Sequence, residues 1–318
     1  MNFIDKLQKP FFVMAPLANV TDAAFRQMIA KYGKPDIMFT EFVSADGLMS
    51  EGRDRLLPDL LFTESERPLI AQLFTADPEK MFGAAKLIQE IGFDGIDINM
   101  GCPDRSVMKQ GAGACLMKDP LLARELMNAA KAGAPNLTLS VKTRVGDTKN
   151  NLSTWLPELL AEKPNMITVH ARTRKEMSKV PANWERIKEA VEIAKGSNTV
   201  IVGNGDVIDL DDARAKAEMT GCGGIMLGRA IFGNPWLFNK GKKIEDISIP
   251  EKMAVMIEHS KLFEELLGNI KSFHIMRKHY KAYAHGFDGA KELRVKLMQT
   301  ENVADVEAIV NTFLTSYK

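Results

Sequence analysis

The segment Asn99–Pro103, with the sequence NMGCP, places a single cysteine where a catalytic thiol could act. A short apolar run from Gly95 leads into this segment, which is typical of a buried strand, and the run breaks at Gly101. Because Gly101 has no side chain and Pro103 has a fixed φ, a ligand can approach the backbone and the sulfur of Cys102 closely. Position alone leaves two interpretations of Cys102, a reactive thiol at a strand end or a small buried hydrophobe.

Polar and charged side chains follow other short apolar runs in the same way. Each could be an ordinary loop residue, but together they supply amides, arginines, a lysine and a histidine. This set is too polar for packing and too poor in carboxylates for a metal centre, so we predict no metal site. The strand-end residues are Pro16, Leu17, Ala18, Glu41, Gln72, Asn99, Lys142, Arg144, His170, Arg172, Arg174, Asn204, Gly205, Asp206, Gly228 and Arg229.

Eight apolar runs, separated by segments with helical spacing of apolar residues, predict an α/β protein built on a (β/α)8 TIM barrel. An open doubly wound sheet is the alternative, but no GxGxxG follows the first predicted strand. The predicted strands are Phe11–Ala15, Ile37–Thr40, Leu69–Phe74, Gly95–Asn99, Leu137–Lys142, Met166–His170, Thr199–Gly203 and Gly224–Leu227. The predicted helices are Asp22–Tyr32, Pro78–Ile91, Pro120–Lys131, Thr154–Glu162, Trp184–Lys195 and Leu210–Met219.

The ends of the seventh and eighth predicted strands have the composition of a phosphate site. Barrels commonly bind phosphate there through backbone amides, and Arg229 could add a bidentate contact. The rest of such a ligand would lie across the barrel mouth, over Lys142 and His170. Because a lysine at the end of an apolar strand needs a partner, Lys142 favours a ligand-binding role. His170 alone would be interpreted first as a core or loop histidine.

The chain after residue 240 has helical periodicity and no convincing strand, so we predict a catalytic barrel over residues 1–240 and a small C-terminal all-helical domain over residues 241–318. The stretch Asn269–Met298 carries seven basic residues and two acidic ones, a local charge of +5, with Phe273, Tyr280 and Tyr283 interleaved. Basic residues with aromatics can hold a nucleic-acid backbone and stack on bases. The alternative is a solvated helix face over an aromatic core.

The bulk composition excludes several classes of protein. The 318 residues carry a formal net charge of +1, so we expect no general attraction to nucleic acid, only a local basic patch. Cys102, Cys115 and Cys222 lie far apart without a CxxC pair or His/Cys ligand spacing, which disfavours a disulfide framework and a zinc site, and we interpret the last two as packing residues. The N-terminus lacks the apolar core of a signal peptide, and no apolar run is long enough to span a bilayer. We expect a cytoplasmic, monomeric protein.

In order and spacing, these residues resemble the dihydrouridine synthases over essentially the whole predicted barrel and into the tail. The matching blocks are Met14–Asp22, Asn99–Pro103, Gly111–Ala114, Ser140–Arg144, His170–Arg174, Asn204–Asp206, Gly228–Arg229, Met276–His279, Tyr283, Gly286 and Gly289–Arg294. One segment departs from the family pattern, the loop Lys175–Trp184, which lacks the usual aromatic and glycine. We expect this loop to bear on substrate entry.

The resemblance implies an enzyme that binds FMN non-covalently and uses NADPH to reduce the C5–C6 double bond of particular uridines in tRNA. Hydride would pass from flavin N5 to C6, and Cys102 would donate a proton to C5, as a mostly protonated thiol can. The FMN-binding residues implied are Pro16, Leu17, Ala18, Gln72, Lys142, His170, Asn204, Gly205, Asp206, Gly228 and Arg229. The substrate-binding residues implied or expected are Asn99, Arg172, Arg277, Lys278 and Arg294.

Three other functions fit parts of the sequence. An FMN barrel that reduces a free pyrimidine or another small enone would explain the polar strand ends but not the basic tail. A dihydrouridine synthase could also act on a different RNA. A non-catalytic RNA-binding or scaffold protein on a barrel is disfavoured by the complete set of strand-end groups.

Overall fold

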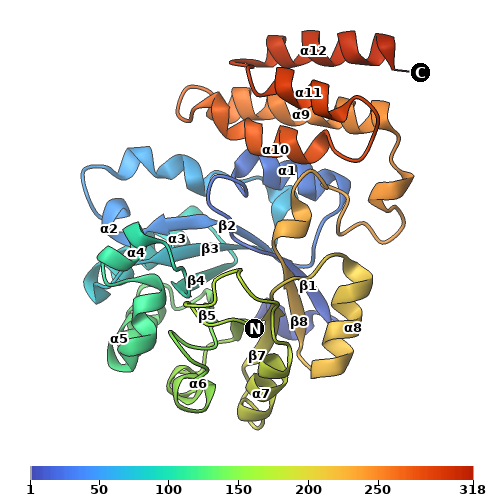
Figure 1. The fold of residues 1–318 in the computed structure, drawn as a ribbon. Helices are drawn as coiled ribbons and strands as arrows, with labels where there is room; N and C mark the ends of the chain where they lie inside the picture. The colour runs from blue at the N-terminus through green and yellow to red at the C-terminus, as the bar shows by residue number, and fades with distance from the viewer. Residues whose placement is uncertain (1, 318) are drawn as a thin grey trace.

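Eight parallel strands close into a barrel, which confirms the predicted (β/α)8 architecture. The structure is a computed structural model, and it describes residues 2–317. The strands pair in the order β1-β8-β7-β6-β5-β4-β3-β2 (Figure 1), and a bridge between Val13 and Ile37 joins β1 to β2. The strands are β1 (Phe11–Met14), β2 (Met38–Ser44), β3 (Leu69–Phe74), β4 (Gly95–Met100), β5 (Thr138–Arg144), β6 (Met166–His170), β7 (Val200–Asn204) and β8 (Gly224–Leu227).

Each predicted helix of the barrel is present, with ends shifted by no more than two residues. Several begin as the sequence indicates: the Asp77 carboxylate accepts hydrogen bonds from the N–H groups of Glu79 and Lys80, and Pro78 occupies the first turn. The helices around the barrel are α1 (Ala23–Tyr32), α2 (Ala45–Leu48), α3 (Pro78–Ile91), α4 (Arg105–Lys109), α5 (Pro120–Gly133), α6 (Leu152–Ala161), α7 (Glu185–Ile193) and α8 (Leu210–Thr220).

Two short helices and the end of one strand were not predicted. Helices α2 and α4 are only one turn long, too short for apolar periodicity to reveal them. Strand β2 continues beyond its predicted end at Thr40, past an irregularity between Phe39 and Phe42. As a result, Phe42 reaches the mouth of the barrel.

The C-terminal helices pack on the barrel through α1 (Figure 1). Phe25 of α1 stacks on His259 of α9, with ring centroids 5.1 Å apart, and lies 4.6 Å from His279 of α10. Lys271 pairs with Glu41 of β2, and one apolar cluster runs through both parts. The helices are α9 (Ile249–Leu267), α10 (Arg277–Tyr283), α11 (Ala290–Leu297) and α12 (Val303–Ser316).

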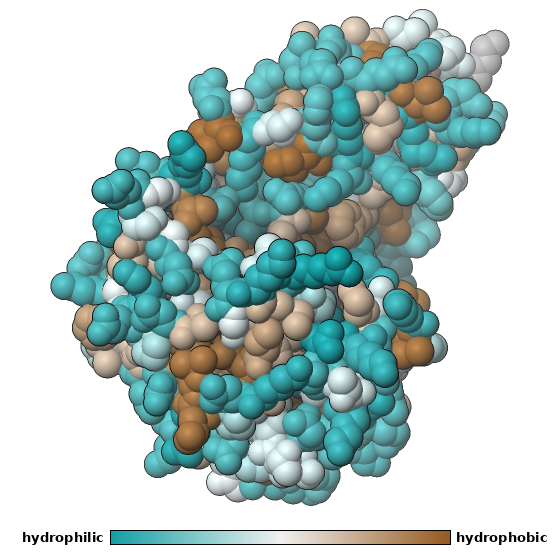
Figure 2. Space-filling view, turned by 60° about the vertical axis from the view of Figure 1, so that its left-hand side comes forward, coloured by the Kyte–Doolittle hydropathy of each residue, from teal (hydrophilic) through white to brown (hydrophobic). Residues whose placement is uncertain are grey.

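The face of the molecule in Figure 2 is mostly hydrophilic, and the helical part projects from the barrel with a recess between the two. The predicted boundary at residue 240 falls in the segment that connects the buried Phe238 to α9. Within residues 2–317, no helix has the length and apolarity that a bilayer crossing requires.

Candidate active site

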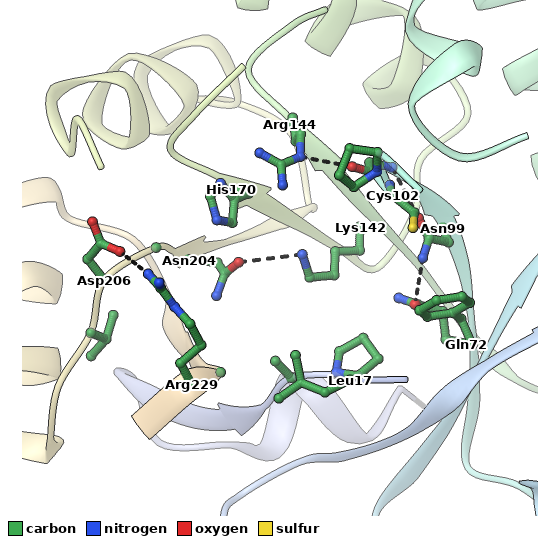
Figure 3. Close-up of a pocket in the computed structure, with 18 residues that line it drawn as sticks. Leu17, Gln72, Asn99, Cys102, Lys142, Arg144, His170, Asn204, Asp206 and Arg229 are labelled. Atoms are coloured by element: carbon green, nitrogen blue, oxygen red, sulfur yellow. Dashed lines mark hydrogen bonds and ion pairs between the residues drawn. The ribbon is translucent and has the colours of Figure 1, made fainter. Parts of the chain in front are cut away.

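The carboxyl ends of the strands surround a cavity of about 260 Å³ (Figure 3). Every predicted FMN-binding residue except Ala18 lines it, together with Cys102 and Asn99. Ala18 lies just outside, in an exposed position of the loop after β1. The lining residues are Ala15, Pro16, Leu17, Phe42, Gln72, Asn99, Gly101, Cys102, Pro103, Lys142, Arg144, His170, Asn204, Gly205, Asp206, Val207, Gly228 and Arg229.

A chain of hydrogen bonds fixes the turn that carries Cys102. Gln72 Nε2 donates to Asp97 Oδ2 at 2.7 Å, and Asn99 Nδ2 donates to Gln72 Oε1 at 2.9 Å. Asn99 Oδ1 then accepts hydrogen bonds from the backbone N–H groups of Gly101, at 3.2 Å, and Cys102, at 2.9 Å. An ionised carboxylate can only accept hydrogen bonds, so Asp97 sets the orientation of both amides.

Asp97 lies at the buried start of this chain. Burial raises its pKa to about 6, an effect that hydrogen bonds from Ser140 and Gln72 oppose. The Ser140 hydroxyl donates to Asp97 Oδ1 at 2.5 Å. With a pKa of about 6, most of the Asp97 carboxyl groups are ionised at pH 7.

The Cys102 thiol is half-buried at the rim of the cavity. Loss of hydration raises its pKa above the ordinary value of 9.0, so the thiol is protonated at neutral pH. Arg144 braces the same turn, since its Nε donates to Gly101 O at 2.9 Å and its Nη1 to Thr173 O at 3.2 Å. This arrangement suits a proton donor better than a thiolate nucleophile.

Lys142 provides a positive charge without a carboxylate partner at the cavity wall. In residues 2–317 its ammonium group has one hydrogen bond, to Asn204 Oδ1 at 3.4 Å, while Asn204 Nδ2 donates to Met226 O at 2.8 Å. Desolvation, and then the charge of Arg144, lowers the pKa of Lys142 to about 8. The group is therefore mostly charged at pH 7 and available to an anionic ligand.

His170, at the end of β6, is neutral at pH 7. Desolvation and the nearby charges of Lys142 and Arg144 hold its pKa well below 6.5. Its Nδ1 atom is buried and has no hydrogen-bond partner in the described part of the chain. A buried polar atom without a partner beside a cavity is a natural contact for a polar ligand.

The turn after β7 combines an unusual backbone with an ion-pair network. Gly205 has φ 131° and Asp206 has φ 50°, and the Gly205 carbonyl accepts a hydrogen bond from Trp184 Nε1 at 3.0 Å. A Cβ at position 205 would lie 2.9 Å from Ala182, so only glycine fits there. The Asp206 carboxylate pairs with both Arg172 and Arg229, which holds Arg229 at the cavity edge.

Arg172, for which we predict a contact with substrate, is held by other parts of the chain in this structure. Its side chain is 3% exposed and does not line the cavity. Besides its pair with Asp206, Arg172 Nε donates to Val180 O at 2.6 Å. Arg172 thus ties the turn after β7 to the loop that departs from the family pattern.

The basic stretch in the C-terminal helices is less available than its composition indicates. Tyr280 and Tyr283 are 0% and 1% exposed, so they are core residues and cannot stack on bases. Arg277 pairs with Glu301 at 3.1 Å, and Arg294 Nη1 donates to Ala284 O at 2.7 Å, at the end of α10. None of the three basic residues predicted there, Arg277, Lys278 and Arg294, lines the cavity, and Lys278 is exposed whereas the other two are half-buried.

The fold and the site together define a TIM-barrel enzyme with its functional groups at the carboxyl ends of the strands. The family model described as "Dihydrouridine synthase (Dus)" matches residues 13–318. "Probable tRNA-dihydrouridine synthase 2" from Bacillus subtilis (strain 168) is 38% identical over 321 residues, which cover 99% of this chain and 98% of that protein. The chain belongs to the dihydrouridine synthase family and is an enzyme.

Two further similarities extend the comparison. "Probable tRNA-dihydrouridine synthase" from Staphylococcus aureus (strain MRSA252) is 36% identical over 318 residues, covering 98% of this chain and 95% of that protein. The structure of histamine dehydrogenase from Rhizobium sp. 4-9 superposes with a TM-score of 0.55 at 15% identity, over 79% of this chain and 48% of that one. The second similarity concerns the fold alone.

Proposed function

We propose that this enzyme is an FMN-dependent tRNA-dihydrouridine synthase that uses NADPH to reduce the C5–C6 double bond of particular uridines. The observation that carries this proposal is the Cys102 thiol at the rim of a cavity whose wall holds Lys142, which forms no ion pair within residues 2–317, and His170, whose buried Nδ1 has no hydrogen-bond partner there. The names of the relatives from B. subtilis and S. aureus favour tRNA as the substrate.

The residues present fit a flavin mononucleotide. The turns at Gly205 and Gly228, with Arg229 beside them, suit the phosphate, whose charge the two arginines around Asp206 favour. Lys142, Gln72 and the unpartnered Nδ1 of His170 offer polar contacts to the ring system. When bound, the flavin would supply a hydride for C6 of the uracil ring.

Cys102 would complete the reduction by transferring a proton from Sγ to C5. The S–H bond breaks and a C5–H bond forms, and the resulting thiolate regains its proton from solvent. The positive charges of Lys142 and Arg144 favour that thiolate, although burial has the larger effect on its pKa. The chain from Asp97 to Asn99 would keep the Cys102 backbone in one position during this step.

The charge of Lys142 would act on the cofactor. An ammonium group that forms no ion pair within residues 2–317 can stabilise negative charge that develops on a reduced flavin. His170, being neutral, would contribute a hydrogen bond and no second charge.

The substrate must enter as a flipped nucleotide, because a base in a helix cannot reach the end of a barrel. Asn99, beside Cys102, would contact the flipped uracil or the flavin. On the C-terminal helices Lys278 is free to meet an RNA backbone, whereas Arg277 and Arg294 would first have to exchange their present partners.

A dihydrouridine map of total RNA tests this function. We expect a strain that lacks this gene to lose dihydrouridine at defined tRNA positions, and the wild-type gene or Cys115→Ala to restore it. Cys115 is a matched control because it is also half-buried but does not line the cavity. Cys102→Ala should restore nothing. An unchanged map, together with reduction of a free pyrimidine or enone by the purified protein, would replace the proposal with a small-molecule reductase.

A further inference from the structure

A second groove of about 830 Å³ runs outward from the active-site cavity on the far side of Cys102. It shares Phe42, Cys102 and Pro103 with the cavity, so the two spaces adjoin at these residues. None of the roles proposed for the cavity residues involves a ligand in this groove. Its lining residues are Phe42, Cys102, Pro103, Asp104, Arg105, Met108, Lys109, Arg174 and Met177.

The groove carries unpaired positive charge. Arg105 and Lys109 of α4 are exposed, and neither forms an ion pair within residues 2–317. The one acidic side chain in the lining is Asp104, which caps α4 by accepting a hydrogen bond from the Ser106 N–H at 2.8 Å. A small anion or a phosphate would therefore be attracted to the exposed face of α4.

Two further cations, Arg174 and Lys118, add to the positive charge beside the groove. Arg174, from the loop after β6, shares the Asp147 carboxylate with Lys118. Two cations around one carboxylate leave a net charge of +1 beside the groove. The positive potential thus extends from α4 across to the loop after β6.

The groove also has an apolar part. Phe42 packs edge-on against Phe74, with ring centroids 5.8 Å apart and planes at 73°, and this contact restrains its ring. Met177, which is 45% exposed, and the half-buried Met108 also line the groove. A base can pack on such a surface because every base presents an apolar face.

We propose that this groove binds the nucleotide adjacent to the reacting uridine, with its base against Phe42 and Met177 and its phosphate near Arg105 and Lys109. This inference rests on the proposed function. RNA is covalently continuous, so the neighbour of a base in the cavity must lie at the rim, where the groove begins. The loop that bears Met177 belongs to the segment that departs from the family pattern, and this loop would contribute to the choice of sequence around the target.

The double variant Arg105→Gln/Lys109→Gln tests the groove in the full-length, FMN-loaded enzyme with unmodified tRNA and NADPH. We expect kcat/KM for tRNA to fall about tenfold or more, mainly through a higher KM, because a contact with substrate backbone contributes binding. The slope of log(kcat/KM) against log salt should become shallower by about one, the effect of losing roughly one phosphate contact. The matched control is Lys86→Gln/Lys188→Gln, two exposed lysines on α3 and α7, which should behave like the wild type.

The possible outcomes separate the two proposals. A wild-type enzyme that forms no dihydrouridine overturns the proposed function itself. If the wild type is active and the double variant has the same KM and salt dependence, the groove does not bind the flanking nucleotide. Should the double variant unfold at a lower temperature than the wild type, the single variant Lys109→Gln, at the exposed end of α4, provides the test, with about half the change in log KM expected.

Discussion

Asp97 Oδ2 accepts a hydrogen bond from Gln72 Nε2 at 2.7 Å, and both side chains are completely buried. The two residues lie on neighbouring strands, where Gln72 of β3 is paired with Asp97 of β4. This contact does not involve the thiol itself. It fixes the orientation of the Gln72 amide, which in turn directs Asn99 Oδ1 toward the backbone N–H group of Cys102. It gives a buried carboxylate a positioning role in the proposed reaction.

We predict that Asp97→Ala changes the environment of Cys102 although the two side chains are not in contact. Without the carboxylate, the Gln72 amide can rotate, and the N–H groups of Gly101 and Cys102 lose a fixed acceptor. At about 1 kcal/mol for each lost hydrogen bond, the loss of one or two bonds should slow dihydrouridine formation by about 5-fold to 30-fold. The alkylation rate of Cys102 against pH, followed by mass spectrometry of its peptide, should shift as well.

Ser140→Ala is the matched control for this prediction. It removes the other hydrogen bond to Asp97 and leaves the bond to Gln72 in place. Because this bond also lowers the pKa of Asp97, the comparison is made above pH 8, where the carboxylate stays ionised, and there we expect the alkylation rate of Ser140→Ala to resemble that of the wild type. If Asp97→Ala lowers the unfolding temperature but leaves the alkylation profile and kcat unchanged, Asp97 serves stability only.

Cys102→Ala should reduce dihydrouridine formation by about 10²-fold to 10⁴-fold, the usual contribution of a general acid. The barrel should remain folded, since Cys102 is half-buried in a turn outside the strands. Single-turnover measurements with FMN-loaded enzyme and tRNA provide the rate, and Cys115→Ala should retain wild-type turnover. Equal rates for Cys102→Ala and the wild type would remove the thiol from the mechanism.

The sequence predicts the barrel well because buried parallel strands are short, continuous apolar runs. All residues of β1, β3, β4, β7 and β8 are buried, and each was recognised by its apolar run. Polar side chains at the ends of such runs must converge, so most of the cavity lining could be predicted as well. Phe42 was missed because its strand continues past an irregularity, which apolar spacing does not reveal.

Contacts between distant segments decide what local spacing leaves open. Tyr280 and Tyr283 lie among basic residues in the sequence, but α10 turns both of them inward toward α9, where Tyr280 hydrogen-bonds with Ser260 and Tyr283 packs near His259. Arg172 follows a strand end as the ligand-binding residues do, yet its partners Val180 and Asp206 bury it. Local spacing cannot distinguish a charge that faces a ligand from one that supports a loop, because the difference depends on residues far along the chain.

Lys142 makes FMN binding depend on pH in a predictable direction. With a pKa of about 8, its ammonium group is charged at pH 7 and progressively loses its charge above pH 8. The affinity of the cofactor-free protein for FMN should therefore weaken as the pH rises from 7 to 9. In Lys142→Met the affinity should be lower at pH 7 and nearly flat over this range. Fluorescence titration with FMN at each pH measures the affinity of both proteins. If the affinity of Lys142→Met fell with rising pH in parallel with that of the wild type, this role for Lys142 would be contradicted.

His259 and His279 form a buried pair between the barrel and the C-terminal helices that should make this contact sensitive to acid. Their rings lie 4.6 Å apart, both are 0% exposed, and all four ring nitrogens lack a hydrogen-bond partner within residues 2–317. Burial lowers the pKa of His279 from 6.5 to about 3 and that of His259 well below 6.5. Unfolding exposes both rings to water, where they bind protons below pH 6.5.

The unfolded state therefore binds more protons than the folded state once the pH is below 6.5, and stability is lost as the pH falls. At pH 5 one such histidine costs about 2 kcal/mol. Asp22 and Asp97, whose pKa values are raised to about 6, act in the opposite direction below pH 6, so one histidine is best isolated by comparing variants. In His279→Phe the drop in unfolding temperature between pH 7.5 and pH 5 should be a few degrees smaller than in the wild type. The exposed His285→Gln should show the wild-type drop, and an equal drop in all three proteins would exclude His279 as a source of acid sensitivity.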